Sequence, residues 1–420
     1  VPILRWAPDY QRSWLRPDLI AGLTVAALVV PKALGYAGIA GVPIEYGLYA
    51  AAAGAILYAL VGGSSQIATG PSSALAAVAA GALLTAGVSS DEDAIALVAA
   101  ITFVSGLLYL ALALLRMGWI SQFLSKAVIT GFLFGAAIQV VIGELPKLTG
   151  TEAEGSNSWR KLGDWIDGLG DTDATTLLVG ASALALIFGL RIFAPKAPRA
   201  LVLVVLGIAA SVILGLEDEG VAVVGDVPRG LPSVTLPDWE FVRDNIQVIA
   251  GASVGLLLIG FSQTAGDARS FATKHGYRVD INQESAAQGV ANVGSGLVQG
   301  IPVSTSLSAS SLNDESGART PVASLTTGVL VVLTLLVLAP LFSDLPNAVL
   351  AAVIIDAVTG GMMDVAEMRR LRRVKRTDFW IALAAIVGVL SAGVLAGVLI
   401  GVALSILWLI SVSTLSLIHI

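Results

Sequence analysis

The feature that most constrains this chain is a succession of apolar stretches, each long enough to cross a lipid bilayer or half of one. Hydrophobic residues make up 56% of the 420 residues and charged residues only 13%, too few charges to cover a water-soluble domain. The 45 glycines suit close helix–helix approach in lipid. We therefore expect an all-α multispanning membrane protein with about fourteen spans, near 18–38, 44–61, 71–87, 94–115, 120–142, 174–193, 200–215, 245–265, 284–299, 303–316, 320–342, 345–361, 378–394 and 396–413.

The basic residues predict the orientation of these spans. If the N-terminus is cytoplasmic, most of the 24 Lys and Arg fall on the cytoplasmic side, including the cluster RRLRRVKR at 369–376. This positive-inside pattern predicts that both termini are cytoplasmic. We interpret 369–376 as a loop that fixes topology rather than as a nucleic-acid or lipid site. The loops 144–173 and 216–244 are expected outside, the first with a short amphipathic helix at 156–168.

Two of the spans are interrupted by polar, glycine- and proline-containing sequence. GGSSQIATGPSS precedes the third span, and LVQGIPVSTSLSASSLNDESG contains the tenth. Broken helices at matching positions in two halves indicate the midplane site of a transporter. Because seven spans separate the two breaks, the chain reads as two seven-span repeats of opposite orientation, about 18–215 and 245–414. The two short helices would then point their N-termini at each other.

Two facing helix N-termini predict an anion site. Each end exposes unpaired N–H groups and about half a positive charge. The hydroxyl groups at these ends are expected to cap the helices and to donate hydrogen bonds to an oxyanion. They belong to Ser72, Ser73, Ser304, Thr305 and Ser306.

Three motifs resemble the sulfate permease (SulP) family of anion transporters: RPDLIAGLTVAALVVPKALGYAGIAGVPIEYGLYAA at 16–52, GPSSAL at 70–75 and NQESAAQGVANVGSGLVQGIPVSTS at 282–306. The resemblance covers nearly the whole chain. It implies a uracil-permease-like fold with a core domain that moves like an elevator against a gate domain, and a homodimer formed through the gate. Most members carry a cytoplasmic STAS domain after the last span, and this chain stops where that domain would begin.

The family's substrate residues map onto this chain with three departures. The Pro-Gln pair that precedes an aromatic residue in the first span is here Pro31 and Lys32, followed by Tyr36. The acidic residue of the eighth span, linked to sodium or proton coupling, is here Gln263. The Arg that follows the serine run is here Ala309.

The departures suggest that charge has been redistributed within the site. We hypothesise that Lys32 supplies the fixed positive charge of the site, since a lysine within a span is costly and usually functional. The alternative is that it snorkels to an interface or pairs with a carboxylate such as Asp356 or Asp267. Without an acid at Gln263, cation dependence is expected to be weak, and Asp267, one turn later, is the remaining coupling candidate for Na⁺ or H⁺.

These observations predict a transporter of small anions in the plasma membrane: sulfate, with bicarbonate or a dicarboxylate as further candidates. The alternatives are a passive anion channel and a nucleobase permease on the same fold. With no Cys and no nucleophile–base or metal-ligand pattern, we expect neither an enzyme nor a metal or other cofactor. Residues 1–17 are expected to form a cytoplasmic segment and 18–414 the transporter domain. The tail 415–420, LSLIHI, reads like a translated sequencing adapter, so the natural chain is expected to continue past about 414.

Overall fold

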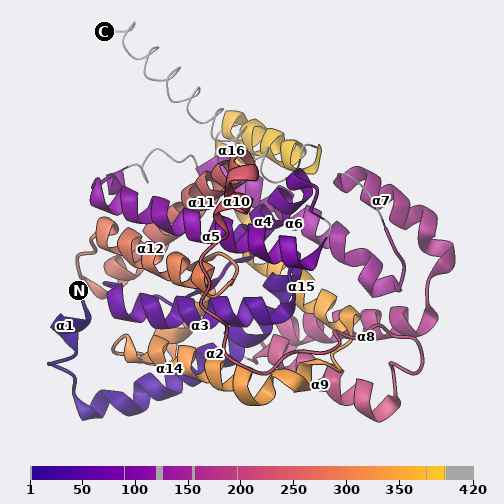
Figure 1. Cartoon of the computed structure of the whole chain (residues 1–420), viewed down its shortest axis with the longest axis horizontal. Coiled ribbons are helices and arrows are strands. Elements are labelled where there is room, and N and C mark those ends of the chain that lie inside the picture. Colours follow the sequence, from indigo (N-terminus) through magenta and orange to yellow (C-terminus); the bar gives the residue numbers. More distant parts are fainter. Residues whose placement is uncertain are drawn as a thin grey trace, which may run out of the picture.

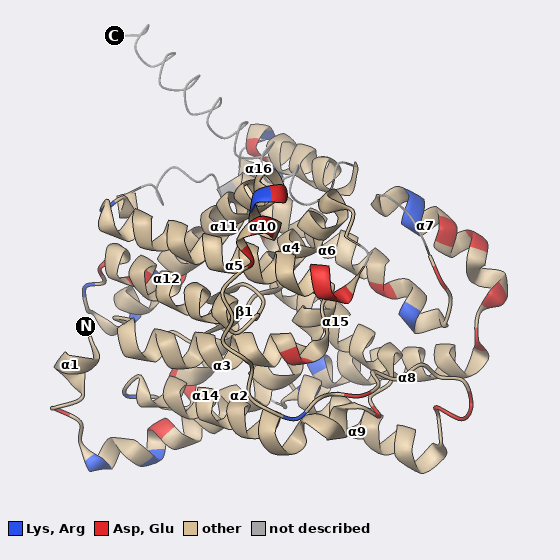
Figure 2. Cartoon of the chain, viewed as in Figure 1, with Lys and Arg blue, Asp and Glu red and all other residues tan. Residues whose placement is uncertain are grey.

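The computed structural model describes residues 2–88, 90–119, 126–153, 157–195, 197–374, 376–391 and 393. Within these residues, eight helices are long and apolar enough to cross a membrane. Most of them lie side by side in one bundle (Figure 1), and charged residues gather mainly near helix ends and in loops (Figure 2). The prediction of an all-α multispanning protein is confirmed, apart from two three-residue strands.

The first half of the chain holds one helix for each span predicted there. The additional short helix α7 confirms the amphipathic helix expected near 156–168. The elements are α1 (Ile3–Trp6), α2 (Arg12–Ala40), α3 (Ile44–Val61), β1 (Thr69–Pro71), α4 (Ser73–Ala86), α5 (Asp91–Leu114), α6 (Lys126–Thr149), α7 (Ser158–Asp167), η2 (Gly168–Asp171), α8 (Ala174–Phe193) and α9 (Arg199–Leu214).

The second half repeats this order, with a strand again preceding a short helix. The elements are α10 (Trp239–Asp244), α11 (Ile246–His275), α12 (Ile281–Leu297), β2 (Val303–Thr305), α13 (Leu307–Glu315), α14 (Val322–Leu333), η3 (Thr334–Leu338, a π-helix), η4 (Ala339–Phe342), α15 (Asn347–Gly361), α16 (Val365–Val374) and a helix at 376–391. The span predicted at 396–413 and the tail 415–420 lie outside the described residues.

Local sequence explains where these helices begin and end. Asp173 and Asp280 accept hydrogen bonds from the first-turn N–H groups of α8 and α12, as N-cap residues do. α2 and α4 end at Gly41 and Gly87, whose φ angles of 76° and 67° lie in the left-handed region that glycine adopts without strain. Glycine and acidic caps therefore set several of the span boundaries.

Small residues allow the close packing that positions the site. On α5 and α12, a Cβ atom added at Gly106 would come within 2.5 Å of the backbone nitrogen of Val293, and one at Gly296 within 2.7 Å of that of Phe103. Such contacts replace the hydrophobic driving force that lipid does not provide. Away from this pair, Arg199 of α9 donates to the buried Asp356 of α15 at 2.7 Å, so one charged residue inside a span has a partner.

The beginning of α2 is tied to the second half of the chain by a buried carboxylate. Asp18 accepts hydrogen bonds from the backbone N–H groups of Arg319 and Thr320, at 2.7 and 3.1 Å, and from the Thr320 hydroxyl at 2.6 Å. These groups precede α14, so Asp18 satisfies polar groups that would otherwise be buried without partners. α2 therefore connects the two halves beside the interrupted helices.

Candidate functional site

The two interrupted helices meet at a short antiparallel ribbon. β1 and β2 pair with Thr69 opposite Thr305, Gly70 opposite Ser304 and Pro71 opposite Val303. α4 begins at Ser73, just after β1, and α13 begins at Leu307, just after β2. Because the strands run in opposite directions, the N-termini of the two helices face each other across the ribbon. Both segments are broken as predicted, and the pairing supplies backbone partners where lipid offers none.

A polar stripe on α12 holds the ribbon in place. Asn292 donates to the carbonyl of Val303 at 2.9 Å and accepts from its N–H at 3.0 Å. Gln288 donates to the Thr69 hydroxyl at 2.9 Å, and Ser295 donates to the carbonyl of Ile301 at 2.8 Å. Sequence reasoning missed this role. The signal was present, because three polar residues at helical spacing within an apolar span indicate a buried polar partner.

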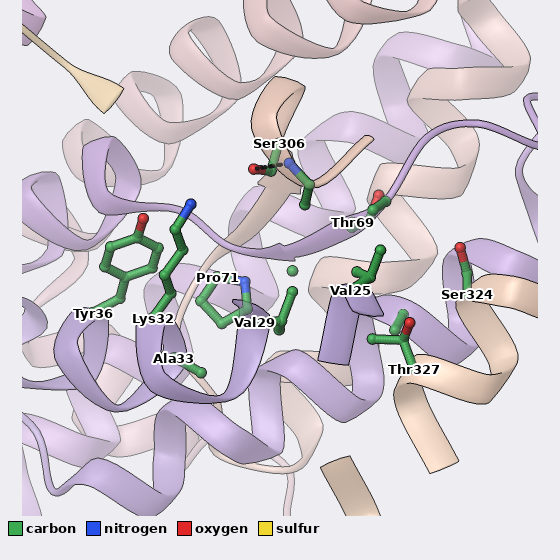
Figure 3. Close-up of a pocket in the computed structure, with 14 residues that line it drawn as sticks. Val25, Val29, Lys32, Ala33, Tyr36, Thr69, Pro71, Ser306, Ser324 and Thr327 are labelled. Carbon is green, nitrogen blue, oxygen red and sulfur yellow. Dashed lines mark hydrogen bonds between the residues drawn. The ribbon is translucent and has the colours of Figure 1, made fainter. Parts of the chain in front are cut away.

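A cavity of about 30 Å³ lies beside the ribbon. Three of the predicted site residues line it: Lys32 and Tyr36 from α2, and Ser306 before α13. The Lys32 ammonium and the Tyr36 hydroxyl point to the same side of α2, the side on which Ser306 lies (Figure 3). The remaining lining residues are Val25, Val29, Ala33, Ala55, Ala68, Thr69, Gly70, Pro71, Ala309, Ser324 and Thr327.

Lys32 contacts the second interrupted helix directly. Its ammonium group donates to the hydroxyl of Ser308 at 3.1 Å, and within the described residues it forms no ion pair with a carboxylate. The proposed pairing with Asp356 or Asp267 is therefore absent, since Asp356 pairs with Arg199 and Asp267 accepts from Thr305. The ammonium group therefore lies beside the ribbon with Ser308 as its hydrogen-bond partner.

Two hydroxyls of the predicted set face α11 instead of this cavity. Ser304 donates to the carbonyl of Gly260 at 3.4 Å, and Thr305 donates to the carboxylate of Asp267 at 2.7 Å. Asp267 thus lies next to β2, as expected for a residue facing the site.

Capping differs between the two short helices. Ser306 caps α13 by accepting from the N–H of Ala309 at 3.4 Å. Ser72 occupies the cap position of α4 but makes no capping hydrogen bond, so the expected capping there is wrong. Ser73 interacts with the Tyr36 hydroxyl, and the side-chain oxygen of Gln263 on α11 is buried without a partner. Neither Ser72, Ser73 nor Gln263 is among the residues that line the cavity.

The chemistry of the cavity favours an anion. A lysine, two hydroxyl-bearing side chains of the predicted set and the N-terminal end of α13 line it, and the lining residues named above include no carboxylate. Helix N-termini and ammonium groups both stabilise negative charge. In the part of the chain that the structure describes, no group of three His, Asp or Glu could hold a metal ion.

Sequence comparisons match the chain to a known family and to proteins named as sulfate transporters. The family described as "Sulfate permease family" matches residues 15–385. The chain is 34% identical over 411 residues to the "Probable sulfate transporter MT1781" of Mycobacterium tuberculosis, covering 96% of this chain and 73% of that protein. It is 31% identical to the bovine "Sodium-independent sulfate anion transporter", covering 90% of this chain and 67% of that protein.

Solved structures share the fold at lower sequence identity. The murine Solute Carrier 26 family member A9 anion transporter in the inward-facing state superposes with a TM-score of 0.89, at 23% identity, over 98% of this chain and 71% of that one. The transmembrane domain of the cyanobacterium bicarbonate transporter BicA gives a TM-score of 0.79, at 23% identity, over 93% of this chain and 98% of that one. The uracil-permease-like inverted repeat, with core and gate domains, agrees with these folds. The match over residues 15–385 and the 34% identity to the mycobacterial relative show that this chain belongs to the sulfate permease family.

Proposed function

We propose that the chain is a secondary active transporter of small anions, with sulfate as the first candidate and bicarbonate or a dicarboxylate as the next. The observation that carries the proposal is the convergence of α4 and α13 at the ribbon, with Lys32 beside it. The anion would lie against Lys32, Tyr36 and Ser306 and accept hydrogen bonds from the free N–H groups at the start of α4. The negative charge of the anion would compensate the positive charge of Lys32, which lies within the membrane-spanning helix α2.

Movement of the core against the gate would carry this site across the membrane, as the family resemblance implies. Asp267 is the candidate for ion coupling, because its carboxylate accepts a hydrogen bond from Thr305 in β2. A cation that bound to Asp267 would therefore act directly on the ribbon. We propose H⁺ or Na⁺ as its ion. We further propose that the protein works as a homodimer in the plasma membrane with cytoplasmic termini, in keeping with the basic loops. Ser72, Ser73, Gln263, Ser304 and Thr305 remain predicted members of the binding site on the α4 and α11 sides of the ribbon.

Uptake of radiolabelled sulfate into proteoliposomes tests the function. We expect saturable uptake that unlabelled sulfate inside the vesicles accelerates, because a carrier returns faster when loaded. Bicarbonate, succinate and uracil are added in turn as competitors. A flux that does not saturate and shows no acceleration by internal sulfate would indicate a channel. Competition by uracil alone would indicate a nucleobase permease.

A further inference from the structure

A second, larger cavity of about 610 Å³ lies at the other end of α4, away from the ribbon. The C-terminal turns of α2 and α4 form one wall, and α6, α7, Ser391 and Gly393 form the others. The cavity therefore lies between α2 and α4, which adjoin the ribbon, and α6 and α7. Its polar lining residues are Thr85, Gln139, Glu144, Lys147, Asn157, Ser158, Lys161 and Ser391.

The charged groups of this cavity are two lysines and one glutamate. Lys147 and Glu144, both on α6, form an ion pair at 3.1 Å. The ammonium group of Lys161, near the start of α7, forms neither an ion pair nor a hydrogen bond with any described residue. Its ammonium lies against α6, 3.9 Å from where a Cβ atom would stand on Gly143. The ammonium groups of Lys147 and Lys161 therefore share one carboxylate, and these three groups together carry a net positive charge.

Burial makes this charge costly. Burial lowers the pKa of Lys161, the neighbouring ammonium of Lys147 lowers it further, and Glu144 opposes both effects. A partly buried cation that shares its only nearby carboxylate with a second lysine is destabilising, and a bound anion would relieve that cost. The side-chain oxygen of Gln139, also buried here without a partner, is a hydrogen-bond acceptor and so does not contribute to holding an anion.

Two tryptophans hold α7 across this cavity. The Trp159 indole donates to the Ser391 hydroxyl at 3.3 Å, and the Trp165 indole donates to the Thr149 hydroxyl at the end of α6 at 3.1 Å. Asn157 caps the helix by accepting from the N–H of Arg160. The acidic residues of α7 come after its basic start, so its charges are segregated along the helix (Figure 2). The lysine at position 161 is thereby held at the cavity rather than free to sample solvent.

We propose that this cavity is a second anion site, a vestibule in which Lys161 holds a small inorganic oxyanion or carboxylate before it reaches the ribbon. The anion would give Lys161 the counter-charge that Glu144 already gives to Lys147. A fixed cation in a confined polar cavity concentrates anions locally and speeds their association. The vestibule rests on the proposed transport function, but anion binding to it can be measured without transport.

Sulfate uptake in right-side-out and inside-out membrane vesicles tests the kinetic role. We expect Lys161→Gln to raise KM about five-fold in one orientation only, with little change in the maximal rate, because one partly screened charge is lost. Lys161→Arg should restore the lower KM. The matched control is Arg243→Gln, which removes an exposed charge from α10, paired with Asp244 at 3.6 Å. An unchanged KM for Lys161→Gln, or an equal change in both orientations, would overturn the proposal.

Chemical protection of the amine tests binding directly. The full chain in detergent is treated with an amine-acylating reagent, and acylation of Lys161 is followed by peptide mass spectrometry. Sodium sulfate should slow this acylation several-fold relative to lactobionate, a bulky anion, at equal ionic strength. The protection should persist in Lys32→Gln, where the ribbon site is impaired. No protection would refute the vestibule, whereas protection in a wild-type protein without uptake would refute only the transport function.

Discussion

Replacing Asn292 with leucine removes the link between α12 and β2 while keeping a side chain of similar size. In the wild-type protein this amide satisfies both the N–H and the carbonyl of Val303, and both residues are buried, at 1% and 0% exposure. The leucine variant leaves two backbone groups without partners at the depth of the ribbon. Each such group costs about 1–3 kcal/mol, so we expect a loss of ~3 kcal/mol after local relaxation.

Thermal unfolding in detergent, followed by loss of the monodisperse peak in size-exclusion chromatography, measures this loss. The matched control is Asn347→Leu, because Asn347 makes a single side-chain hydrogen bond of 3.3 Å, to the carbonyl of Val223 in a loop. We expect a clear drop in Tm for Asn292→Leu and a small one for the control. The surviving folded fraction should also transport sulfate more slowly, since the start of α13 is no longer positioned. Equal Tm values for the two variants would show that α12 does not support the ribbon.

Four further predictions concern the two cavities and helix packing. Lys32→Gln should raise the KM for sulfate about ten-fold, and unchanged uptake kinetics would refute its role as the fixed charge of the site. Asp267→Asn should abolish any dependence of uptake on a sodium or proton gradient, and a steep dependence that survives would assign coupling elsewhere. Gly47→Ala should destabilise the protein by about 1–3 kcal/mol, because the added Cβ atom would lie 2.0 Å from a carbonyl oxygen of α2. Gly189→Ala is the control in the same unfolding assay, because the space around Gly189 is open. Because the pKa of Lys161 is lowered, this side chain loses its charge at a lower pH than an ordinary lysine does. As pH rises through that range, the KM for sulfate measured from the vestibule side should increase in the wild-type protein. It should stay constant in Lys161→Arg, because arginine remains charged.

Much of the architecture could be predicted because a bilayer fixes the length of each span. α3 and α8 have the predicted bounds of 44–61 and 174–193. The two broken helices were also visible, since Gly70–Pro71 and Gly300–Pro302 bring helix breakers and hydroxyl groups into regions that should be continuous. Backbone physics then requires that the freed groups find partners within the protein.

The register of the ribbon could not be predicted. Strands of three residues carry no alternating pattern, so nothing in the sequence says that Gly70 faces Ser304 rather than one of its neighbours. The register decides which hydroxyls reach the cavity: Ser306 does, while Thr305 turns to Asp267 on α11. The vestibule also escaped prediction, because it depends on how α7 folds back onto α6, an arrangement set by indole contacts between residues distant in sequence.

Residues 69–71 and 303–305 are more than two hundred positions apart, yet their main chains are joined edge to edge. A rocking-bundle cycle that parted α4 from α13 would have to break this pairing in a region without water to replace it. In the proposed elevator cycle, the two short helices would therefore move as one rigid unit, and the anion would enter or leave past its flank, where α2 lies. A crosslink between α4 and α13 should leave transport intact, whereas a crosslink between this pair and the helices around it should stop transport.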